Sequence, residues 1–458
     1  MRVYFLGIGG IGMSAIARYL NLRGDEVMGY DRTPSELTHQ LQQEGIQINY
    51  EDTKDNVPLN LDLVIYTPAI PTDSQQMQYI QSLGIPMEKR SVALGHITKD
   101  KKVLAVSGTH GKTTTCGMIT TIMANSPVGC SAFLGGILKN IDSNFLYNAQ
   151  SPYVVVEADE YDRSFLHLTP YASVITAIDP DHMDIYHTYD NLHKAFEDFA
   201  CLTNKQGMLF VKSDKTKLIN DLKDILPLKT YSLTDHNAWA KAENITICSG
   251  NYHFDYVSKD ETIKDICLNY PGRHNIENAV AAITICSYAL KQANVSQQER
   301  IHAIKSISTF SGMKRRLEYI IKTPNQIYID DYAHHPQEIR TTINSLRELY
   351  PDKKFTGIFQ PHLYTRTRDL CDDFAKSLSL LDTAILLPIY PARELPIEGV
   401  TSKIIYDKIT CKEKYLTNKA DVFTLIKEKQ PHLLITFGAG DIDRLVPQIA
   451  KTLQEINK

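Results

Sequence analysis

Residues 102–124 read KVLAVSGTHGKTTTCGMITTIMA, and we interpret the rest of the chain around them. Residues 103–107 predict a short buried parallel strand, because they are almost entirely apolar. A turn with two glycines follows, and residues 118–123 then carry apolar side chains at helical spacing. A strand, a glycine-containing turn, a Lys-Thr pair and a helix are typical of a loop that holds nucleotide phosphates.

The predicted phosphate loop has a compact form. The common pattern G-x-x-x-x-G-K-[ST] requires glycine at position 106, where this chain has Val106, so the match is to G-T-x-G-K-T-T. Lys112 would lie along the β- and γ-phosphates, and Thr113 would give a hydroxyl to Mg²⁺. A Gly-Lys-Thr that begins a helix by accident is the alternative. The predicted nucleotide contacts are Gly108, Thr109, His110, Gly111, Lys112, Thr113 and Thr114.

Length and composition narrow the class of protein. The 458 residues correspond to about three domains of ~150 residues. A net charge of −4 argues against a mainly electrostatic nucleic-acid binder. The 8 cysteines form no C-x-x-C pair, which favours a reducing compartment over disulfides or a zinc site. No apolar run approaches the ~18 residues of a membrane span, and residues 1–6 lead into a strand without a signal peptide. We therefore expect a cytoplasmic enzyme.

A second glycine loop lies near the start of the chain. Residues 3–6 predict a strand, residues 7–12 complete G-x-G-x-x-G, and residues 26–30 predict a strand that ends at Asp31. This is a dinucleotide-type fingerprint, but the loop binds a diphosphate and suits a nucleotide sugar as well as NAD. The residues of this segment leave both readings open. Lys89-Arg90, further along, fits either a ligand contact or an exposed surface pair.

Two further predicted strands end in side chains that could join the phosphate loop. The strand at 153–156 leads into Glu157, and the strand at 173–178 leads towards His182. Ligands of open parallel sheets bind at the carboxyl ends of the strands, so Lys112 is expected near both side chains. Glu157 is placed like an acid that holds Mg²⁺.

Other side chains here allow two readings. His182 is a second metal ligand, a phosphate contact or an ordinary loop histidine. Three acids either hold a metal through water or form a solvated turn: Asp159, Glu160 and Asp162.

The remaining chain predicts a third domain. Residues 312–317, GMKRRL, mark its start, and their arginines suit a transferring phosphoryl group or form a basic linker. Strands and helices then alternate, with polar clusters at the strand ends. We predict an α/β fold of three domains: a Rossmann-like domain at 1–98, a P-loop ATPase-like α/β domain at 99–310 and a Rossmann-like domain at 311–458.

Taken together, these motifs resemble the Mur ligases of peptidoglycan synthesis over essentially the whole chain. The resemblance rests on GIGGIGMSAIA, GTHGKTTT, EADEYDRSFL, DPDHMD, PGRHNIENA, GMKRRL, DDYAHHP, QPHLYTRTRDL and GAGDI. It implies a UDP-sugar domain, a central ATPase and a mobile C-terminal domain that binds an amino acid. It also settles the first glycine loop in favour of a UDP-sugar diphosphate.

The resemblance implies a reaction and its participants. ATP and Mg²⁺ would activate the carboxylate of UDP-N-acetylmuramate as an acyl phosphate, and the amine of L-alanine would displace phosphate. A monomer or homodimer is expected, with no nucleic-acid partner.

The resemblance also assigns roles to individual residues. The catalytic residues would be Lys112, Arg316, His334, His362 and Arg366. Further nucleotide contacts would be His274, Asn278, Arg316 and Asp331. The metal ligands would be Thr113, Glu157 and His182. The substrate contacts would be Gly9, Gly10, Gly12, Met13, Ser14, Asp31 and Tyr332.

One position departs from the family, and three other functions compete with this one. Leu363 stands where relatives often have arginine, which weakens the roles assigned to residues 362–368. A recycling ligase would add a preformed peptide to the same sugar nucleotide, but its counterparts differ in the first glycine loop and in residues 360–368. A dehydrogenase leaves residues 108–114 unexplained. A nucleotide-binding module without catalysis does not explain the reactive side chains Glu157, His182 and Arg316.

Overall fold

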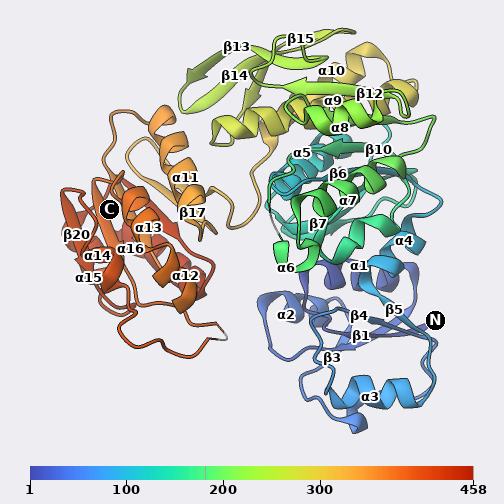
Figure 1. Ribbon diagram of the computed structural model, residues 1–458, viewed down its shortest axis with the longest axis horizontal. Helices are drawn as coiled ribbons and strands as arrows, with labels where there is room; N and C mark the ends of the chain where they lie inside the picture. Colours follow the sequence, from blue (N-terminus) through green and yellow to red (C-terminus); the bar gives the residue numbers. More distant parts are fainter. Residues whose placement is uncertain (181, 393, 457–458) are drawn as a thin grey trace. The chain divides into compact units, whose positions relative to one another are not determined.

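The computed structural model describes residues 1–180, 182–392 and 394–456. The chain divides into two compact units. The first contains Met1–Ile245, His253–Leu268 and Asn275–Phe310; the second contains Thr246–Tyr252, Asn269–His274 and the residues from Ser311 onward. Figure 1 shows their elements coloured along the sequence. Within the described residues, every helix is too short or too polar to cross a membrane.

The first unit begins with a five-stranded parallel sheet of order β3-β2-β1-β4-β5. Its strands are β1 (Arg2–Leu6), β2 (Glu26–Tyr30), β3 (Gln47–Asn49), β4 (Leu63–Tyr66) and β5 (Met87–Lys89). Its helices are α1 (Ile11–Arg23), α2 (Glu36–Gln43), η1 (Lys54–Asn56), α3 (Gln75–Ser82) and α4 (Arg90–Thr98). Val3 and Phe5 of β1 join one hydrophobic cluster, whereas Tyr4 and Leu6 join another. Both faces of the sheet are therefore buried, as the apolar run of β1 predicts.

A ten-stranded sheet of order β15-β14-β13-β12-β11-β10-β6-β9-β7-β8 also belongs to the first unit, except for the end of β13 and the start of β14 at residues 246–252. Its strands are β6 (Lys102–Ser107), β7 (Ser131–Leu138), β8 (Ser143–Leu146), β9 (Tyr153–Glu157), β10 (Pro170–Ile175), β11 (Met208–Lys212), β12 (Leu228–Ser232), β13 (Ala240–Cys248), β14 (Asn251–Ser258) and β15 (Thr262–Leu268). Its helices are α5 (Lys112–Ala124), η2 (Tyr161–His167), α6 (Met183–Tyr186), α7 (Tyr189–Cys201), α8 (Thr216–Leu222), α9 (Arg273–Gln292), α10 (Gln297–Lys305) and η3 (Ser306–Thr309). Parallel pairing places β6 between β10 and β9.

One strand lies three residues earlier in the sequence than its apolar pattern predicts. The prediction placed a strand at 173–178, but β10 ends at Ile175. Thr176 Oγ1 donates instead to the backbone oxygens of Ser107 and His110, at 3.1 and 2.5 Å. Thr109 N donates to Ala177 O at 3.0 Å, so the chain after β10 pairs with the phosphate loop.

The second unit is built on a six-stranded sheet of order β16-β17-β21-β18-β19-β20. Its strands are β16 (Glu318–Lys322), β17 (Ile327–Asp331), β18 (Phe355–Phe359), β19 (Thr383–Leu386), β20 (Glu413–Leu416) and β21 (Leu433–Phe437). Its helices are α11 (Pro336–Leu349), α12 (Tyr364–Asp369), α13 (Cys371–Leu378), α14 (Lys403–Tyr406), α15 (Val422–Lys429), η4 (Asp441–Leu445) and α16 (Val446–Ile456). β16 pairs antiparallel with β17, and the other neighbours are parallel.

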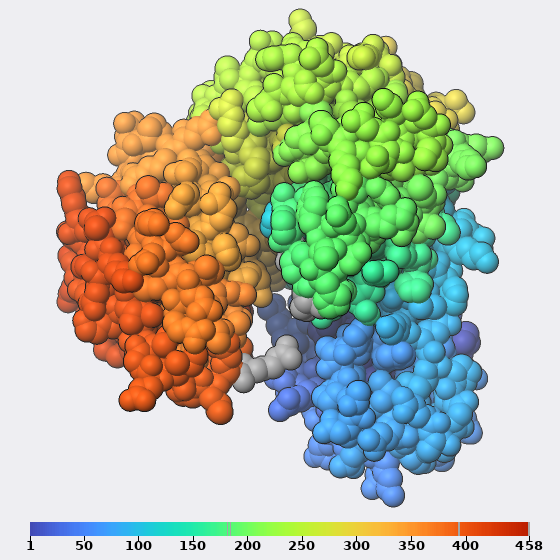
Figure 2. All heavy atoms as spheres, viewed as in Figure 1, coloured from blue at the N-terminus to red at the C-terminus, as the bar shows by residue number. Residues whose placement is uncertain are grey.

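Three sheets with flanking helices confirm the predicted α/β class. Within the first unit, α1 packs against β7 and β8 of the second sheet, and Figure 2 shows the blue N-terminal residues directly against the cyan and green ones. The boundaries at 98/99 and 310/311 stay predictions.

Candidate active site

The phosphate loop turns between β6 and α5 at two glycines in left-handed conformations. Gly108 has φ of +137° and Gly111 has φ of +83°. A Cβ atom on Gly108 would lie 2.1 Å from Thr176 Oγ1, so a larger residue does not fit there. Thr113 and Thr114 are buried in the first turn of α5. The loop therefore has the strand–turn–helix geometry that its sequence predicts.

Lys112 is held at the loop by a buried acid. Its Nζ donates to Gly108 O at 2.7 Å and to both carboxylate oxygens of Glu160, at 2.8 and 2.7 Å. The Glu160 side chain has no exposed surface. Burial raises the pKa of Glu160, and the Lys112 charge opposes that rise. In this state the acid keeps the ammonium beside the turn.

Sequence reasoning did not single out Glu160. Its two readings there were a water-mediated metal contact and a solvated turn, shared with Asp159 and Asp162. All the residues from 159 to 162 are polar or aromatic, so periodicity carries no burial signal for the one acid that is buried. The only cue is its position, shortly after the end of a strand that pairs with β6.

A hydroxyl and a carboxylate meet at the start of α5. Thr113 Oγ1 donates to Glu157 Oε1 at 3.0 Å, and Gly135 N donates to Glu157 Oε2 at 3.1 Å. A Cβ atom on Gly135 would lie 2.3 Å from Glu157 Oε2, so a larger residue there would displace the Glu157 carboxylate. Hydroxyl and carboxylate oxygens are ligands that Mg²⁺ prefers. The structure thus brings together two of the three predicted metal ligands.

The third predicted ligand lies beside the other acid. His182 has φ of +53°, and its Nε2 lies 3.9 Å from Glu160 Oε1. Its ring meets that of Tyr161 edge-on, with centroids 5.2 Å apart. Asp181, in the same motif, lies outside the described residues. His182 is therefore placed near the Lys112–Glu160 pair.

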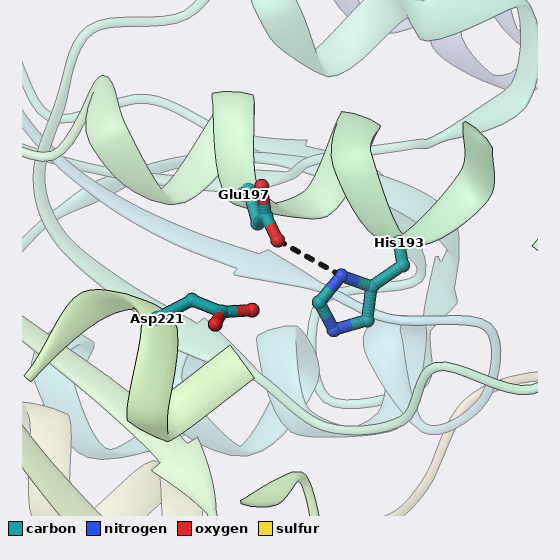
Figure 3. Close-up of side chains that lie close together, drawn as sticks. All are labelled: His193, Glu197 and Asp221. Atoms are coloured by element: carbon teal, nitrogen blue, oxygen red, sulfur yellow. Dashed lines mark ion pairs between the residues drawn. The ribbon is translucent and has the colours of Figure 1, made fainter. Parts of the chain in front are cut away.

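Another group of potential metal ligands joins α7 and α8. Figure 3 shows His193, Glu197 and Asp221 facing one another, with one ligand atom of each within 4.8 Å of the others. His193 Nδ1 lies 3.1 Å from Glu197 Oε1, and Lys194 lies 3.1 Å from the same carboxylate. Pairs spaced three and four residues apart on a helix account for these contacts, and we assign no metal to them.

Asp31 supports the first glycine loop from the end of β2. Gly7 has φ of +85°, and Gly9 N donates to Asp31 Oδ2 at 2.8 Å. A Cβ atom on Gly9 would lie 2.8 Å from that same oxygen. Asp31, a predicted substrate contact, is thus already bonded to the loop backbone.

A cavity of about 280 Å³ lies between the glycine loop and the second sheet. Its lining is formed by Gly10, Ile11, Gly12, Met13, Ala15, Thr67, Arg90, Leu94, Phe133, Leu134, Gly135, Glu157 and Asp159. Of the predicted substrate contacts, Gly10, Gly12 and Met13 are therefore at the cavity. Ser14 is buried, and its hydroxyl donates to Ile11 O at 3.0 Å. Because Glu157 is part of the lining, one space borders both the glycine loop and the predicted metal site.

Lys89 and Arg90 differ in position: Lys89 is at the surface, whereas Arg90 is at the cavity. Lys89 is 45% exposed and pairs with Asp162 at 3.2 Å, as a surface lysine does. Arg90 lines the cavity, and a Cβ atom on Gly12 would lie 2.8 Å from its Nη1. Arg90 is therefore the member placed for ligand contact.

In the second unit, Arg316 projects from an anchored segment. Its neighbours Arg315 and Leu317 have φ of +61° and +44°. Arg315 Nη2 donates to Gly438 O at 2.6 Å, and Leu317 N donates to Asp331 Oδ1 at 3.3 Å. The side chain of Arg316 itself is exposed.

Asp331 ends β17 and stabilises that segment. It accepts from Thr342 Oγ1 at 2.5 Å as well as from Leu317 N. Burial raises the pKa of Asp331 to about 6. The structure thus shows a supporting contact for Asp331, and its contact with nucleotide stays a prediction.

The predicted side chains after β17 and β18 are close to one another. His334 Nδ1 lies 3.0 Å from Tyr332 O, and the His334 and His362 rings are 6.2 Å apart. Arg366 Nη1 lies 3.4 Å from His362 Nδ1. Burial lowers the pKa of both histidines. Near neutral pH they therefore favour the uncharged form, which can accept a proton.

Leu363, the departure from the family pattern, sits at a strained turn within this cluster. It has φ of +72° and precedes α12. Its N–H donates to Tyr390 O at 3.0 Å, and the Tyr390 ring stacks on His362 at 5.7 Å. The turn thus orients His362 through its backbone, whatever side chain occupies position 363.

Asn278 reaches the phosphate loop from α9. A Cβ atom on Gly111 would lie 2.7 Å from Asn278 Oδ1, and Asn278 Nδ2 donates to Asn275 Oδ1 at 2.9 Å. Because α9 begins at Arg273, Asn275 lies inside the helix and does not cap it. His274, also predicted as a nucleotide contact, is exposed in the first turn.

Three family profiles together match most of the chain. They are described as the Mur ligase family catalytic domain at residues 2–102, the Mur ligase middle domain at 106–286 and the Mur ligase glutamate ligase domain at 315–440. The chain belongs to the Mur ligase family. The three matches confirm the resemblance drawn from the motifs.

Named relatives match this Mur ligase over almost its full length. UDP-N-acetylmuramate--L-alanine ligases of Parabacteroides distasonis and Phocaeicola vulgatus are each 47% identical to it. These matches cover 98% and 99% of this chain, and 97% and 98% of the respective relatives. The crystal structure of UDP-N-acetylmuramate-alanine ligase from Thermotoga maritima has a TM-score of 0.83 and 27% identity, and the match covers 99% of each chain. A murein peptide ligase from Psychrobacter arcticus, with a TM-score of 0.67 and 21% identity, shares the fold.

Proposed function

We propose that this Mur ligase uses ATP to join L-alanine to the carboxylate of UDP-N-acetylmuramate, in the synthesis of peptidoglycan precursors in the cytoplasm. Full-length relatives at 47% identity carry that name. The observation that carries the proposal is the cavity lined by both Gly12 and Glu157. A sugar nucleotide held at the glycine loop would present its carboxylate next to the phosphate loop.

The reaction needs two bond exchanges. The substrate carboxylate attacks the γ-phosphorus of ATP, the bond from that phosphorus to the β–γ bridging oxygen breaks, and ADP leaves with an acyl phosphate formed. The alanine amine then attacks the acyl carbon, loses a proton and expels phosphate. Activation is required because a carboxylate is a poor electrophile and oxide a poor leaving group. Water must be kept out, since an acyl phosphate hydrolyses readily.

The first unit would serve the phosphoryl transfer. Lys112 would move from Glu160 to the β- and γ-phosphates, while the loop N–H groups bind phosphate oxygens. Thr113, Glu157 and His182 would hold Mg²⁺, and the contact between Thr113 and Glu157 supplies the oxygen donors that fit it. When bound, Mg²⁺ supplies positive charge that offsets the charge on the phosphates.

The second unit would serve the amino acid and the transferred group. Arg316 would contact the γ-phosphate, because a guanidinium fork suits phosphate oxygens. Arg366 would hold a carboxylate or the acyl phosphate. The uncharged pair His334 and His362 would accept the proton of the attacking amine.

Phosphate release measures this function directly. ATP and Mg²⁺ are supplied with UDP-N-acetylmuramate, and each amino acid is added in turn. Release that requires both the sugar nucleotide and L-alanine supports the proposal. Release without the sugar nucleotide overturns it. Release only with a preformed tripeptide assigns the chain to the recycling ligases instead.

A further inference from the structure

Asn144 joins the glycine loop to the second sheet. It belongs to β8, and its side chain is completely buried. Its Nδ2 donates to Ile11 O and, at 2.9 Å, to Ser14 Oγ. Its Oδ1 accepts from Arg18 Nη1 at 2.5 Å. All three partners lie at the glycine loop or on α1, which follows it.

The orientation of this amide is fixed by its partners. A flipped amide would place its oxygen against Ile11 O and its NH₂ against the guanidinium of Arg18, so donors would meet donors. Arg18 is itself held by Glu44, whose carboxylate accepts from Arg18 Nη2 at 2.7 Å. Arg18 is buried to the same degree as core side chains. Asn144 thus both donates and accepts hydrogen bonds in a network that includes Ile11 and Arg18.

The network stands behind the candidate substrate cavity. Ile11 is part of the cavity lining on the glycine-loop side. On the other side the lining is formed by Phe133 and Gly135 of β7, and β7 pairs with β8 through Phe133 and Phe145. One side chain on β8 therefore connects the two walls between which a sugar nucleotide would lie.

We propose that Asn144 is a positioning residue that sets the distance between the glycine loop and β7, and through it the binding of the sugar nucleotide. This inference rests on the function proposed above. Asn144 acts through the carbonyl of Ile11, because that hydrogen bond ties to β8 the loop backbone that would bind the diphosphate. Without it, the Ile11 carbonyl keeps the bond from Ser14 Oγ but is no longer tied to β8, so the loop can shift relative to the second sheet.

A purely structural role for Asn144 makes a different prediction. If it only adds stability, Asn144→Asp should lower Tm and leave the sugar-nucleotide constants unchanged, because its second carboxylate oxygen meets Ile11 O while the first still accepts from Arg18. If Asn144 positions Ile11, the same variant should fail, because its carboxylate has no hydrogen to donate to the carbonyl. Asn144→Asp therefore separates stability from positioning without a change of side-chain size.

The experiment compares Asn144→Asp and Asn144→Ala in the full-length protein. We measure KM for UDP-N-acetylmuramate and for ATP, the Kd of the sugar nucleotide by calorimetry without ATP, and Tm. We expect both variants to raise the KM and Kd of the sugar nucleotide about tenfold, as the loss of one buried hydrogen bond predicts. KM for ATP should change less than about twofold, and Tm should fall in both variants.

A matched control is available on the same hairpin. Asn148 follows β8, is partly buried, and its Oδ1 accepts from Gln150 N at 3.0 Å, away from the cavity. Asn148→Ala should lower Tm without changing the KM of the sugar nucleotide. Sugar-nucleotide constants that stay at wild-type values in Asn144→Asp overturn the positioning role, and so do equal increases in both KM values. If the wild-type enzyme does not use UDP-N-acetylmuramate at all, the proposed function itself is wrong.

Discussion

The two glycine loops of the first unit have the same strand–turn–helix backbone but different side chains. Each joins a buried parallel strand to a helix, and an acid lies beside each. In the first loop the acid is Asp31, which accepts from the backbone of Gly9. In the second it is Glu160, which accepts from the ammonium of Lys112. The first loop thus offers mainly N–H groups for binding, whereas the second adds a cation and a hydroxyl that can act on a phosphoryl group.

The largest expected effect is at Lys112. Lys112→Ala should lower kcat by about three orders of magnitude or more, because Lys112 is the one lysine of the loop and the loop contains no arginine. Circular dichroism should show an intact fold with a lower Tm, because the buried Glu160 loses its partner, and calorimetry should show normal binding of UDP-N-acetylmuramate. Lys99→Ala, at an exposed lysine, is the control. A variant at position 112 that keeps wild-type turnover would remove the central assignment.

Glu157 tests whether the second loop also depends on metal. Glu157→Gln keeps the size of the side chain but removes the charge beside Thr113. The Mg²⁺ concentration needed for half-maximal activity should rise about tenfold or more, because changes at metal sites typically lower metal affinity by about that factor. A Mg²⁺ titration at saturating ATP measures this. An unchanged Mg²⁺ requirement would place the metal elsewhere.

Gly12 tests the first loop by steric means. A methyl group there would meet Arg90 Nη1 at 2.8 Å, so Gly12→Ala should displace Arg90 from the cavity wall. We expect KM for the sugar nucleotide to rise about tenfold, as for one lost charged hydrogen bond, with a smaller change in kcat. Gly10→Ala should have less effect, since its nearest neighbour would lie at 3.4 Å. A greater effect on ATP than on the sugar nucleotide would reverse the roles of the two loops.

Asp331, at the end of β17, is a third acid beside a turn. It accepts hydrogen bonds from Leu317 N and from the Thr342 hydroxyl, and no cation is among these two donors. With its pKa raised to about 6, the folded protein keeps a proton between pH 4 and 6 that the unfolded chain releases. The free energy of unfolding should therefore fall as pH rises through this window. Asp331→Asn lacks the titration, so its stability relative to wild type should rise from pH 4 to 6 by up to about 3 kcal/mol.

Urea unfolding without ligands, at several pH values, measures that difference. The control is Asp382→Asn in the same unit. Burial opposes ionisation of Asp382, but hydrogen bonds from Phe355 N and Arg347 outweigh it and lower its pKa. Asp382→Asn should therefore become less stable relative to wild type as pH rises, the opposite sign. Parallel curves for Asp331→Asn and wild type would contradict the raised pKa.

Most of the architecture could be predicted from the sequence, because each buried parallel strand is a short run of apolar residues. The run at residues 26–30 predicted the bounds of β2, and the run at 153–156 predicted β9 to within one residue. The prediction failed at β10, where the apolar run continued to Ile178 but the backbone turned to bond the phosphate loop. An apolar pattern predicts that a segment is buried, but it does not predict which groups its backbone will hydrogen-bond.

The candidate site was predictable where chemistry follows a motif. Lys112, Thr113 and Glu157 were predicted and lie together, and so were His334, His362 and Arg366. Glu160 and Asn144 could not be found in this way. Their roles depend on contacts with Lys112 and Ile11, which are distant in sequence, and no periodicity encodes such contacts.

The anchored segment around Arg316 has one further consequence. Hydrogen bonds on both sides hold its backbone at the end of β17, from Tyr332 N to Arg315 O at 2.7 Å and from Leu317 N to Asp331 Oδ1 at 3.3 Å, so the torsions of the side chain are left to point the guanidinium. Ligand binding therefore does not have to order this segment, and the entropic cost of doing so is avoided. This arginine cannot be delivered to a phosphate by local loop closure, and any motion that carries it there must carry β17 and its neighbours as a single body.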